Sequence, residues 1–414
     1  MTTGGGNLAQ DLKTLASRQI SWYVQRILLS MLLISNFLPF YITILTFIFV
    51  IIILVATASL KSDYFNNPNS LTLFIFSLYT GMVAIIYENW LGLFISLAFI
   101  LAIIFFTYYT EIVHPSYLEE VINISLVAGF FCFIFALLEH QELIYEFDYT
   151  WISQTMSKVH ADRVEATFFN PNYYAMILEF LIIMGIYKIF KTKKRRKKLT
   201  FSFLTLCNLL ATLYTGTRTS FLVILAAVFV FFYIIGYKKQ AILSVLALTV
   251  GLIIAVALGY LPRMLDLAYA FSDRFGIWET SWAAIKSQPF FGRGPLTMLV
   301  VFKEFGGKYT QHAHNLILEG LLSYGIIGLI ILIPVGLSLI RLLNRMRRYP
   351  DLRLRLALFC ALITIVVVHG LTDVTIFWIQ TAFLLFYTLL PAKNILAEHE
   401  DLQATIDEAQ IKIK

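Results

Sequence analysis

The residues with the most evident chemistry are a few histidines and arginines that stand between long apolar stretches of this 414-residue chain. His312 and His314, followed by Asn315, directly precede an apolar run. A neutral imidazole at a water-accessible edge is suited to act as a general base; the alternative is an interfacial histidine that only caps the next helix. Two histidines two residues apart do not share a helix face, and no cysteine or carboxylate motif adjoins them, so we expect no metal site.

Two arginines have positions suited to binding an anion. Arg218 follows Thr215-Gly-Thr217 in a short connection between apolar runs. A guanidinium there is costly unless it extends to water or meets an anion, and the second case predicts a phosphate site at the start of the next helix. Arg274 and Trp278 are four residues apart and share a face on a helix. That spacing fits either a packed surface helix or a cation beside an aromatic platform for a sugar ring.

Other polar residues give less specific signals. The segment Pro289-Phe-Phe-Gly-Arg-Gly294 is typical of a turn, and it has neither a preceding strand nor a GKS-type ending, so Arg293 belongs to no nucleotide loop. His369 and Asp373 are spaced i, i+4 at the end of an apolar run and could pair across one helical turn. Glu179 lies inside another run and requires a partner there.

The composition tells what surrounds these residues. Hydrophobic residues make up 59% of the sequence and charged residues 14%, and the mean hydropathy is +0.78. Soluble domains carry roughly a quarter charged residues, whereas here the apolar residues come in blocks near the length of a bilayer span. The composition therefore predicts an all-α polytopic membrane protein.

The net charge of +7 does not indicate nucleic-acid binding in such a chain. Lys and Arg gather in short loops between apolar runs, as the positive-inside rule requires. The three cysteines, Cys132, Cys207 and Cys360, all fall inside apolar runs and indicate neither a disulfide framework nor a metal site.

About twelve membrane-spanning helices are predicted from the lengths of the apolar runs. The first run, residues 27–60, is too long for one span, and Asn36-Phe-Leu-Pro39 divides it into two. The other predicted spans are residues 71–87, 90–109, 121–138, 173–190, 199–214, 221–237, 241–260, 316–340, 356–368 and 376–390.

Three basic segments, residues 191–198, 238–239 and 341–355, predict the orientation of the chain. With these segments in the cytoplasm, both termini are cytoplasmic as well. Four polar segments that were not used to set the orientation then fall together on the outer face. They are residues 139–172, 215–220, 262–315 and 369–373. We therefore expect the chemistry on the extracytoplasmic side, around the large loop between spans nine and ten.

This topology divides the chain into three expected parts. Residues 1–172 hold N-terminal spans and an outer polar segment, and residues 173–392 form a membrane domain that contains the outer loop 262–315. Residues 393–414 form an acidic cytoplasmic tail, to which we assign no function.

Taken in order, several motifs resemble those of the O-antigen ligase and Wzy-type polysaccharide polymerase family. No single motif is specific, but their order from residue 168 to residue 373 is, while residues 1–160 resemble the family only as membrane spans. The motifs are Phe168-Phe-Asn-Pro-Asn172, Thr217-Arg-Thr-Ser220, Arg274-x-x-x-Trp278, Pro289-Phe-Phe-Gly-Arg-Gly294, His312-Ala-His-Asn315 with Glu319 and Gly325, and His369-Gly-Leu-Thr-Asp373.

The resemblance implies a glycosyltransferase of the bacterial inner membrane that uses no metal and no cofactor. It would move a glycan from an undecaprenyl-pyrophosphate carrier in the membrane lipid to a hydroxyl of a glycan or lipid-glycan acceptor. By position, His314 corresponds to the family's essential loop histidine, and Arg218 and Arg274 correspond to its essential arginines. The residues expected to bind substrate are Trp278, Arg293, His312, Asn315, His369 and Asp373.

Two other functions are compatible with a polytopic chain. A lipid-linked oligosaccharide flippase would place charges near the bilayer midplane and show two related halves, whereas here only Glu179 is central and no repeat is evident. A non-catalytic scaffold would tolerate changes in the outer residues. Within the enzyme interpretation, polymerase and ligase differ only in the acceptor, and a flippase and a chain-length regulator are the partners that favour a polymerase.

Overall fold

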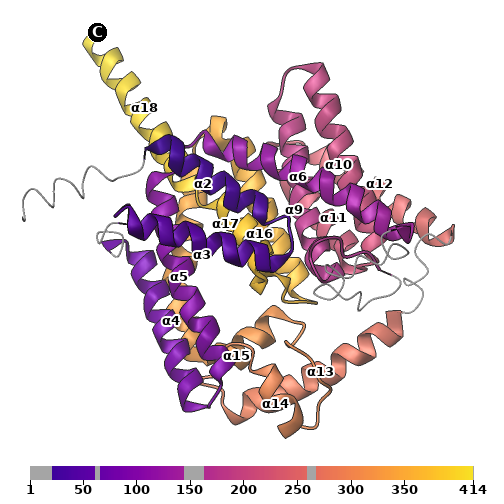
Figure 1. The fold of residues 1–414 in the computed structure, drawn as a ribbon. Helices are drawn as coiled ribbons and strands as arrows, with labels where there is room; N and C mark the ends of the chain where they lie inside the picture. Colours follow the sequence, from indigo (N-terminus) through magenta and orange to yellow (C-terminus); the bar gives the residue numbers. More distant parts are fainter. Residues whose placement is uncertain (1–20, 61–65, 144–162, 259–266, 414) are drawn as a thin grey trace, which may run out of the picture.

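The structure, a computed structural model, describes residues 21–60, 66–143, 163–258 and 267–413, and this part of the chain forms helices and no strand (Figure 1). Each of the twelve predicted spans contains a helix. The first six are α2 (Trp22–Ser35), α3 (Phe40–Ala56), α4 (Pro68–Ile86), α5 (Trp90–Ile112), α6 (Tyr117–His140) and α9 (Pro171–Lys191). The others are α10 (Arg195–Thr215), α11 (Thr219–Ile235), α12 (Lys238–Ala257), α15 (Leu316–Met346), α16 (Arg353–Gly370) and α17 (Ile379–Leu389).

Length and composition identify the membrane-crossing helices. Among the described residues, seven helices are long and apolar enough to cross a membrane, and α2, α3 and α11 are shorter apolar helices. The seven are α4, α5, α6, α9, α15, α16 with the preceding 3₁₀ turn η3 (Pro350–Leu352), and α17 continued into α18 (Ala392–Ile413). The chain is thus an all-α polytopic membrane protein, as predicted, while the number of crossings and their direction stay predictions.

Helix α9 is the centre of the bundle. It is the most buried of the seven long helices and packs against α6, α10, α11 and α16. Asn170 caps its first turn by accepting a hydrogen bond from the Asn172 N–H, and Pro171 occupies the first helical position, where its missing N–H costs nothing. The Asn-Pro-Asn sequence therefore fixes where α9 starts, which places Asn172 at the end of the bundle.

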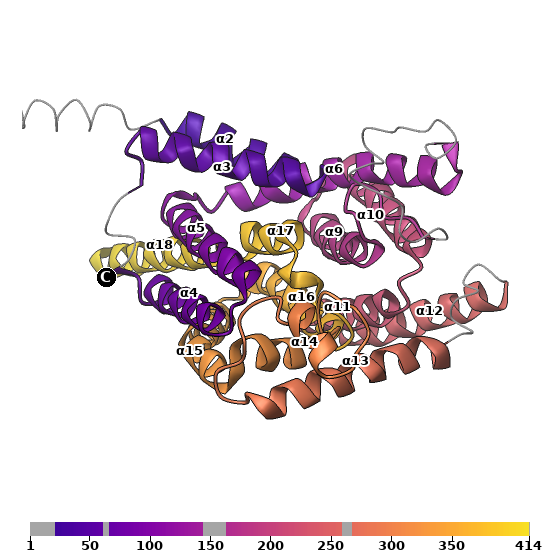
Figure 2. The same cartoon turned by 60° about the horizontal axis from the view of Figure 1, so that its bottom comes forward.

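The predicted outer loop, residues 262–315, contains two helices of its own, α13 (Leu267–Ser287) and α14 (Met298–Glu304). They lie along the edge of the molecule away from the C-terminal end of α18, and Figure 2 turns this edge forward. A small hydrophobic cluster joins both helices to α15. Its buried members are Ala284, Ile285, Met298, Val301 and Leu322. The loop is therefore a folded unit fastened to α15 from residue 267 on, and the predicted residues 262–266 lie outside the described part.

Helix α15 is interrupted at Gly325, whose φ of 63° and ψ of −177° lie outside the helical region. The segment 289–294 supplies the hydrogen bonds that the interruption would otherwise leave unmade. Ile326 and Ile327 donate to the carbonyls of residues 289 and 290, at 3.0 Å each, and Gly294 donates to the Ser323 carbonyl at 2.8 Å. The Pro-Phe-Phe-Gly-Arg-Gly turn thus completes a broken helix.

The C-terminal segment begins as part of the packed structure. Ile395 and Leu396 of α18 are buried, and the Asn394 amide donates to the carbonyls of Thr110 and Val113 at 2.8 and 2.7 Å. Glu398 and Asp401 are exposed, and this part of α18 extends away from the bundle in Figure 1. A cytoplasmic location for residues 393–414 stays a prediction.

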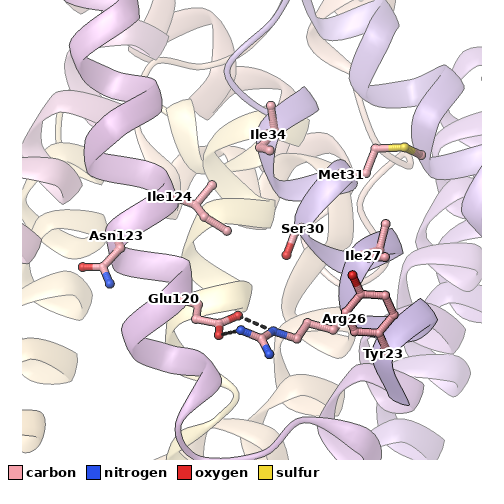
Figure 3. A pocket seen from close by; sticks show the side chains of 9 residues that line it. All are labelled: Tyr23, Arg26, Ile27, Ser30, Met31, Ile34, Glu120, Asn123 and Ile124. Atoms are coloured by element: carbon pink, nitrogen blue, oxygen red, sulfur yellow. Dashed lines mark hydrogen bonds and ion pairs between the residues drawn. The ribbon is translucent and has the colours of Figure 1, made fainter. Parts of the chain in front are cut away.

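A groove of about 560 Å³ lies between α2 and α6 (Figure 3). Apolar side chains such as Ile27, Met31 and Ile124 line it, and an ion pair between Arg26 and Glu120 crosses one end. Glu120 lies near the start of α6, and Glu139 lies in its last turn. The two residues are 19 positions apart, which is roughly 28 Å along the helix axis. The groove therefore belongs to the end of α6 opposite Glu139.

The interruption of α15 predicts a strong effect of adding one methyl group. In Gly325→Ala the new Cβ would lie 2.4 Å from the Phe290 carbonyl oxygen, in a backbone conformation that favours glycine. We expect the unfolding free energy to fall by about 2–3 kcal/mol, measured as a lower thermal midpoint in detergent. Gly336→Ala in the same helix has open space around its Cβ and is the control, with an expected change of about +0.5 kcal/mol. Equal midpoints for the two variants would contradict this account of the turn.

Candidate functional site

Asp373 joins the chain segments that make up the candidate site. Helix α16 ends at Gly370, so Asp373 lies beyond the helix, with a side chain that is only 3% exposed. Its Oδ1 accepts hydrogen bonds from His312 Nε2 (3.0 Å), His314 Nδ1 (3.1 Å) and the Val374 N–H (2.8 Å). Its Oδ2 accepts one from the Asn172 amide at 2.6 Å. A buried carboxylate is tolerated when its oxygens are bonded in this way.

These bonds decide the charge of Asp373. Burial alone raises the pKa of the carboxyl, but the hydrogen bonds and charges of His312 and His314 outweigh burial and hold that pKa well below its usual range. Asp373 is therefore ionised at neutral pH, which means that both histidine nitrogens in contact with Oδ1 donate.

The loop 310–315 is held so that both histidines face this carboxylate. Asn315 caps α15 by accepting from the N–H groups of residues 317 and 318, and its amide donates to the Leu371 carbonyl at 3.0 Å. Glu319 accepts from the Ala313 N–H at 2.8 Å, between the two histidines. His314 itself has a φ of 50°, unusual for a residue with a side chain. The loop is thus tied both to α15 and to the turn after α16.

His314 has the geometry of a general base. Its Nδ1 donates to Asp373, which leaves the Nε2 lone pair available, 3.4 Å from the Thr310 hydroxyl oxygen. The side chain is 25% exposed, about twice the 13% of His312. His312 presents its Nε2 to the same carboxylate oxygen. Burial lowers the pKa of His312, but the hydrogen bond and charge of Asp373 raise it by more, so the net effect favours the protonated ring.

The same three residues could also hold a metal ion. Ligand atoms of His312, His314 and Asp373 all lie within 4.8 Å of one another. The sequence places no carboxylate beside the histidines, but the fold brings Asp373 to them, so the spacing argument against a metal site does not apply here. The observed contacts of 3.0 and 3.1 Å join the nitrogen atoms to the carboxylate oxygen. Ligand atoms about 2.0–2.2 Å from a tetrahedral zinc ion would lie roughly 3.4 Å from one another, so the cluster is compatible both with hydrogen bonding and with a bound metal.

The two predicted arginines approach this cluster from different helices. Arg218 is the residue before α11, and the hydroxyl of its neighbour Thr217 lies 3.2 Å from the Asn172 side-chain oxygen. Arg274 is half-buried on α13 and lies within electrostatic range of His369. Within the described parts of the chain, the Arg274 guanidinium makes no hydrogen bond or ion pair. It is therefore available to an anionic ligand.

Trp278 follows Arg274 by one turn of α13, so the predicted common face exists. Its ring meets Phe275 edge to face, with centroids 5.4 Å apart. The buried indole N–H has no partner among the described residues, and a role in binding substrate stays a prediction.

His369 pairs with Glu179 rather than with Asp373. Its Nδ1 lies 2.9 Å from Glu179 Oε2 and 3.0 Å from Oε1, and both side chains are fully buried. The possibility of a His369–Asp373 side-chain pair is wrong because α16 ends between them. The bond between the two residues is a backbone one, from the Asp373 N–H to the His369 carbonyl. The partner that Glu179 requires is therefore His369, while the His369 Nε2 has no hydrogen-bond partner among the described residues.

Arg293 and Asn315 have contacts within the protein. The Arg293 guanidinium bonds to Glu304 (2.6 Å) and Ser287 (2.9 Å) and lies over the rings of Tyr87 and Phe305. These contacts hold the outer loop together, as the Asn315 cap holds α15. Substrate binding by either residue stays a prediction.

Two residues of the site are absent from the sequence-based candidates. Asn172 bonds directly to Asp373, and Arg163 donates to Asn172, to the Thr217 hydroxyl and to the Thr215 carbonyl. The Asn-Pro-Asn motif directly precedes the predicted span 173–190, but nothing in the sequence indicated that Asn172 faces a residue 201 positions later. Much of the segment before Arg163, residues 144–162, lies outside the described part.

Comparison with known families adds one finding. Residues 201–333 match the family model described as O-antigen ligase. The chain contains an O-antigen ligase family domain. The matched segment runs from α10 into α15 and includes all of the predicted site residues except His369 and Asp373. No curated protein matches the chain.

The match covers about a third of the chain, so the similarity to O-antigen ligases is shown for residues 201–333 alone. The resemblance seen in the motifs is confirmed for residues 201–333, while the roles of individual residues rest on the geometry described above.

The contact between His312 and Asp373 predicts a pH-dependent stability. Because Asp373 raises the pKa of His312 above its ordinary value of 6.5, the stabilisation is complete below pH 6.5 and is lost as the pH rises through the higher folded-state value. His312→Gln should therefore lower the thermal midpoint most at about pH 5.5–6, with a smaller difference at pH 8.5. In an Asp373→Asn background the His312→Gln difference should no longer vary with pH. A difference that grows with pH would contradict the assignment.

Proposed function

We propose that this protein transfers a glycan from an undecaprenyl-pyrophosphate carrier to a hydroxyl of an acceptor glycan or lipid-glycan at the outer leaflet of the bacterial inner membrane. One observation carries the proposal. The two histidines of the loop 310–315 converge on one ionised carboxylate, in a chain whose residues 201–333 form an O-antigen ligase family domain. The free guanidinium of Arg274 supports it by offering a site for an anionic leaving group.

The acceptor hydroxyl loses its proton to His314. Asp373 holds the Nδ1–H, so the Nε2 lone pair accepts the proton as the hydroxyl oxygen forms its bond to the anomeric carbon of the donor. The resulting imidazolium is stabilised by the charge of Asp373. His312 shares the same carboxylate oxygen and fixes its position from the other side.

The leaving group is the lipid pyrophosphate, released as the bond between the anomeric carbon and the phosphate oxygen breaks. Negative charge develops on that oxygen, and fixed cations stabilise it most in a site with little water. Arg218 and Arg274 supply these cations in the proposed mechanism. Arg218 stands at the start of α11 and Arg274 on the helix that covers the outer end of the bundle.

The donor lipid would remain in the membrane while its glycan enters beneath α13 and α14. The predicted orientation puts both termini in the cytoplasm and the site outside. Polymerase and ligase reactions use the same step and differ in the acceptor, which is a lipid-linked glycan in the first case and a lipid-glycan such as a lipopolysaccharide core in the second.

Substitution of the base tests the mechanism. In proteoliposomes supplied with an undecaprenyl-pyrophosphate-linked glycan and acceptor, His314→Gln should reduce product formation by about 10²–10⁴-fold, since proton transfer contributes that much. Arg274→Gln should reduce it by about 10²-fold or more through lost charge stabilisation, and Arg274→Lys by less. Product is counted by the number of glycosidic linkages on a gel.

Matched variants separate a catalytic effect from a loss of product caused by misfolding or low protein abundance. His114→Gln changes an exposed histidine whose ring bonds, within the described part of the chain, to Ser116 alone. Arg347→Gln changes an exposed arginine of a predicted cytoplasmic loop. Both should retain wild-type activity at equal protein abundance. Normal product with His314→Gln would sink the proposal. Unmodified lipid moved across the bilayer, with no new linkage, would identify a transporter instead.

Chelation separates acid–base catalysis from metal catalysis at the same three side chains. Because the family resemblance implies a reaction that uses no metal, we expect excess EDTA to leave the initial rate within about twofold of the untreated value. Loss of activity with EDTA, restored by zinc alone, would show instead that His312, His314 and Asp373 act as metal ligands.

A further inference from the structure

The side chain of Asn172 bonds to three other residues at the candidate site. Its Oδ1 accepts from Arg163 Nη2 at 2.6 Å and lies 3.2 Å from the Thr217 hydroxyl. Its Nδ2 donates to Asp373 Oδ2 at 2.6 Å. Both ends of the amide therefore make hydrogen bonds. The oxygen faces the turn that carries Arg218, and the nitrogen faces Asp373, the carboxylate that binds the proposed base His314.

Arg163 allows only one orientation of this amide. A guanidinium can only donate and an ionised carboxylate can only accept. If the amide were turned by 180°, its NH₂ group would face Arg163 and its oxygen would face Asp373, with two repulsive contacts. Arg163 is itself held by the Thr215 carbonyl at 2.8 Å and the Thr217 hydroxyl at 2.8 Å. The direction of the amide is thus set by charge rather than by packing.

The bond to Oδ2 determines how Asp373 meets the histidines. With Oδ2 occupied by the amide, Oδ1 is the oxygen that His312, His314 and the Val374 N–H share. Without the amide, a buried Oδ2 loses its partner, and the carboxylate can rotate to offer that oxygen to a histidine instead. The Nδ1–H form of His314, which leaves Nε2 free, depends on this arrangement.

We propose that Asn172 is a positioning residue, oriented by Arg163, that fixes the carboxylate of Asp373 and through it the ring of His314. This proposal deepens the proposed function and rests on it for its kinetic consequences. It also connects the two halves of the mechanism, because Thr217, which bonds to Asn172 and Arg163, directly precedes Arg218. A shift of the turn 215–218, which carries Arg218, would therefore move Asn172 and, through Asp373, the ring of His314.

Other charged and titratable groups face the same region from the neighbouring elements. They are Tyr173 and Glu179 of α9, Arg274 of α13, Glu319 of α15 and His369 of α16. None of these groups changes in the variants below, so a shift between variants reports on residue 172 or 163.

The test is the pH profile of kcat/KM for glycan transfer by the full-length protein in proteoliposomes. Asn172→Asp puts a second carboxylate beside Asp373, which makes both imidazoles harder to deprotonate, so the acid limb should move up by about one pH unit. Asn172→Ala should move it less in the same direction and lower kcat about 10-fold with little change in KM, an estimate that treats the loss as one misaligned catalytic group. Arg163→Gln should resemble Asn172→Ala.

Asn208→Ala is the matched control. Asn208 is a buried asparagine of the neighbouring α10 whose side-chain atoms have no hydrogen-bond partner among the described residues. Its removal should leave the pH profile unchanged. A uniform fall in kcat for Asn172→Ala and Asn172→Asp, with no shift of the acid limb, would assign Asn172 a merely structural role and overturn the proposal.

A second measurement does not depend on catalysis. In protein labelled with ¹⁵N-histidine, the ring nitrogens of His314 are identified by their loss in His314→Gln. Wild type should show a protonated Nδ1 and an unprotonated Nε2, and Asn172→Ala should show a mixture of the two tautomers. Unchanged signals in Asn172→Ala would overturn the positioning role. Wild-type transfer by His314→Gln, together with changed signals in Asn172→Ala, would instead reject the proposed function and leave the positioning role intact.

Discussion

The burial of one ionised carboxylate is the constraint on which this end of the molecule depends. Asp373 is almost fully enclosed, and an isolated carboxylate in such surroundings would cost several kcal/mol. Donors from three separate places offset that cost. The loop before α15 supplies two histidines, the start of α9 supplies Asn172, and the backbone supplies the Val374 N–H. The loop, α9 and the end of α16 must therefore meet at one point for Asp373 to remain charged.

A second buried acid–base pair lies deeper in the bundle. Glu179 and His369 bond to each other with no exposure to solvent, on helices α9 and α16 that also carry or precede Asn172 and Asp373. The same two helices are therefore joined by polar contacts at two levels. Such contacts specify the relative register of two apolar helices, which apolar packing alone leaves weakly determined in a membrane.

The sequence was sufficient for the helices and for part of the site. Long apolar runs, separated by Asn36–Pro39 and other short polar segments, predicted the twelve helical segments because burial in lipid leaves few alternatives to a helix. The His-Ala-His-Asn motif and Arg274 were recognisable because polar residues are costly beside apolar runs. The bond between Asn172 and Asp373 was not, since it joins residues 201 positions apart and depends on the packing of α9 against α16. The turn 289–294 was predicted, but its bonds to α15 follow only from three-dimensional contact.

The interrupted helix α15 limits how this protein can be recombined with its relatives. Residues 289–294 complete the helix at Gly325, and the same turn is bonded to the α4–α5 hairpin, where Tyr79 donates to the Phe291 carbonyl and Asn89 to the carbonyls of Arg293 and Pro295. The turn, the hairpin and the first part of α15 must therefore come from the same parent in a chimaera. A chimaera that exchanges the outer loop alone, in order to transplant acceptor preference, would separate these partners. These partners would stay together if one junction were placed within α13, before residue 289, and a second beyond residue 327. The hairpin would then be taken from the same parent as the exchanged segment.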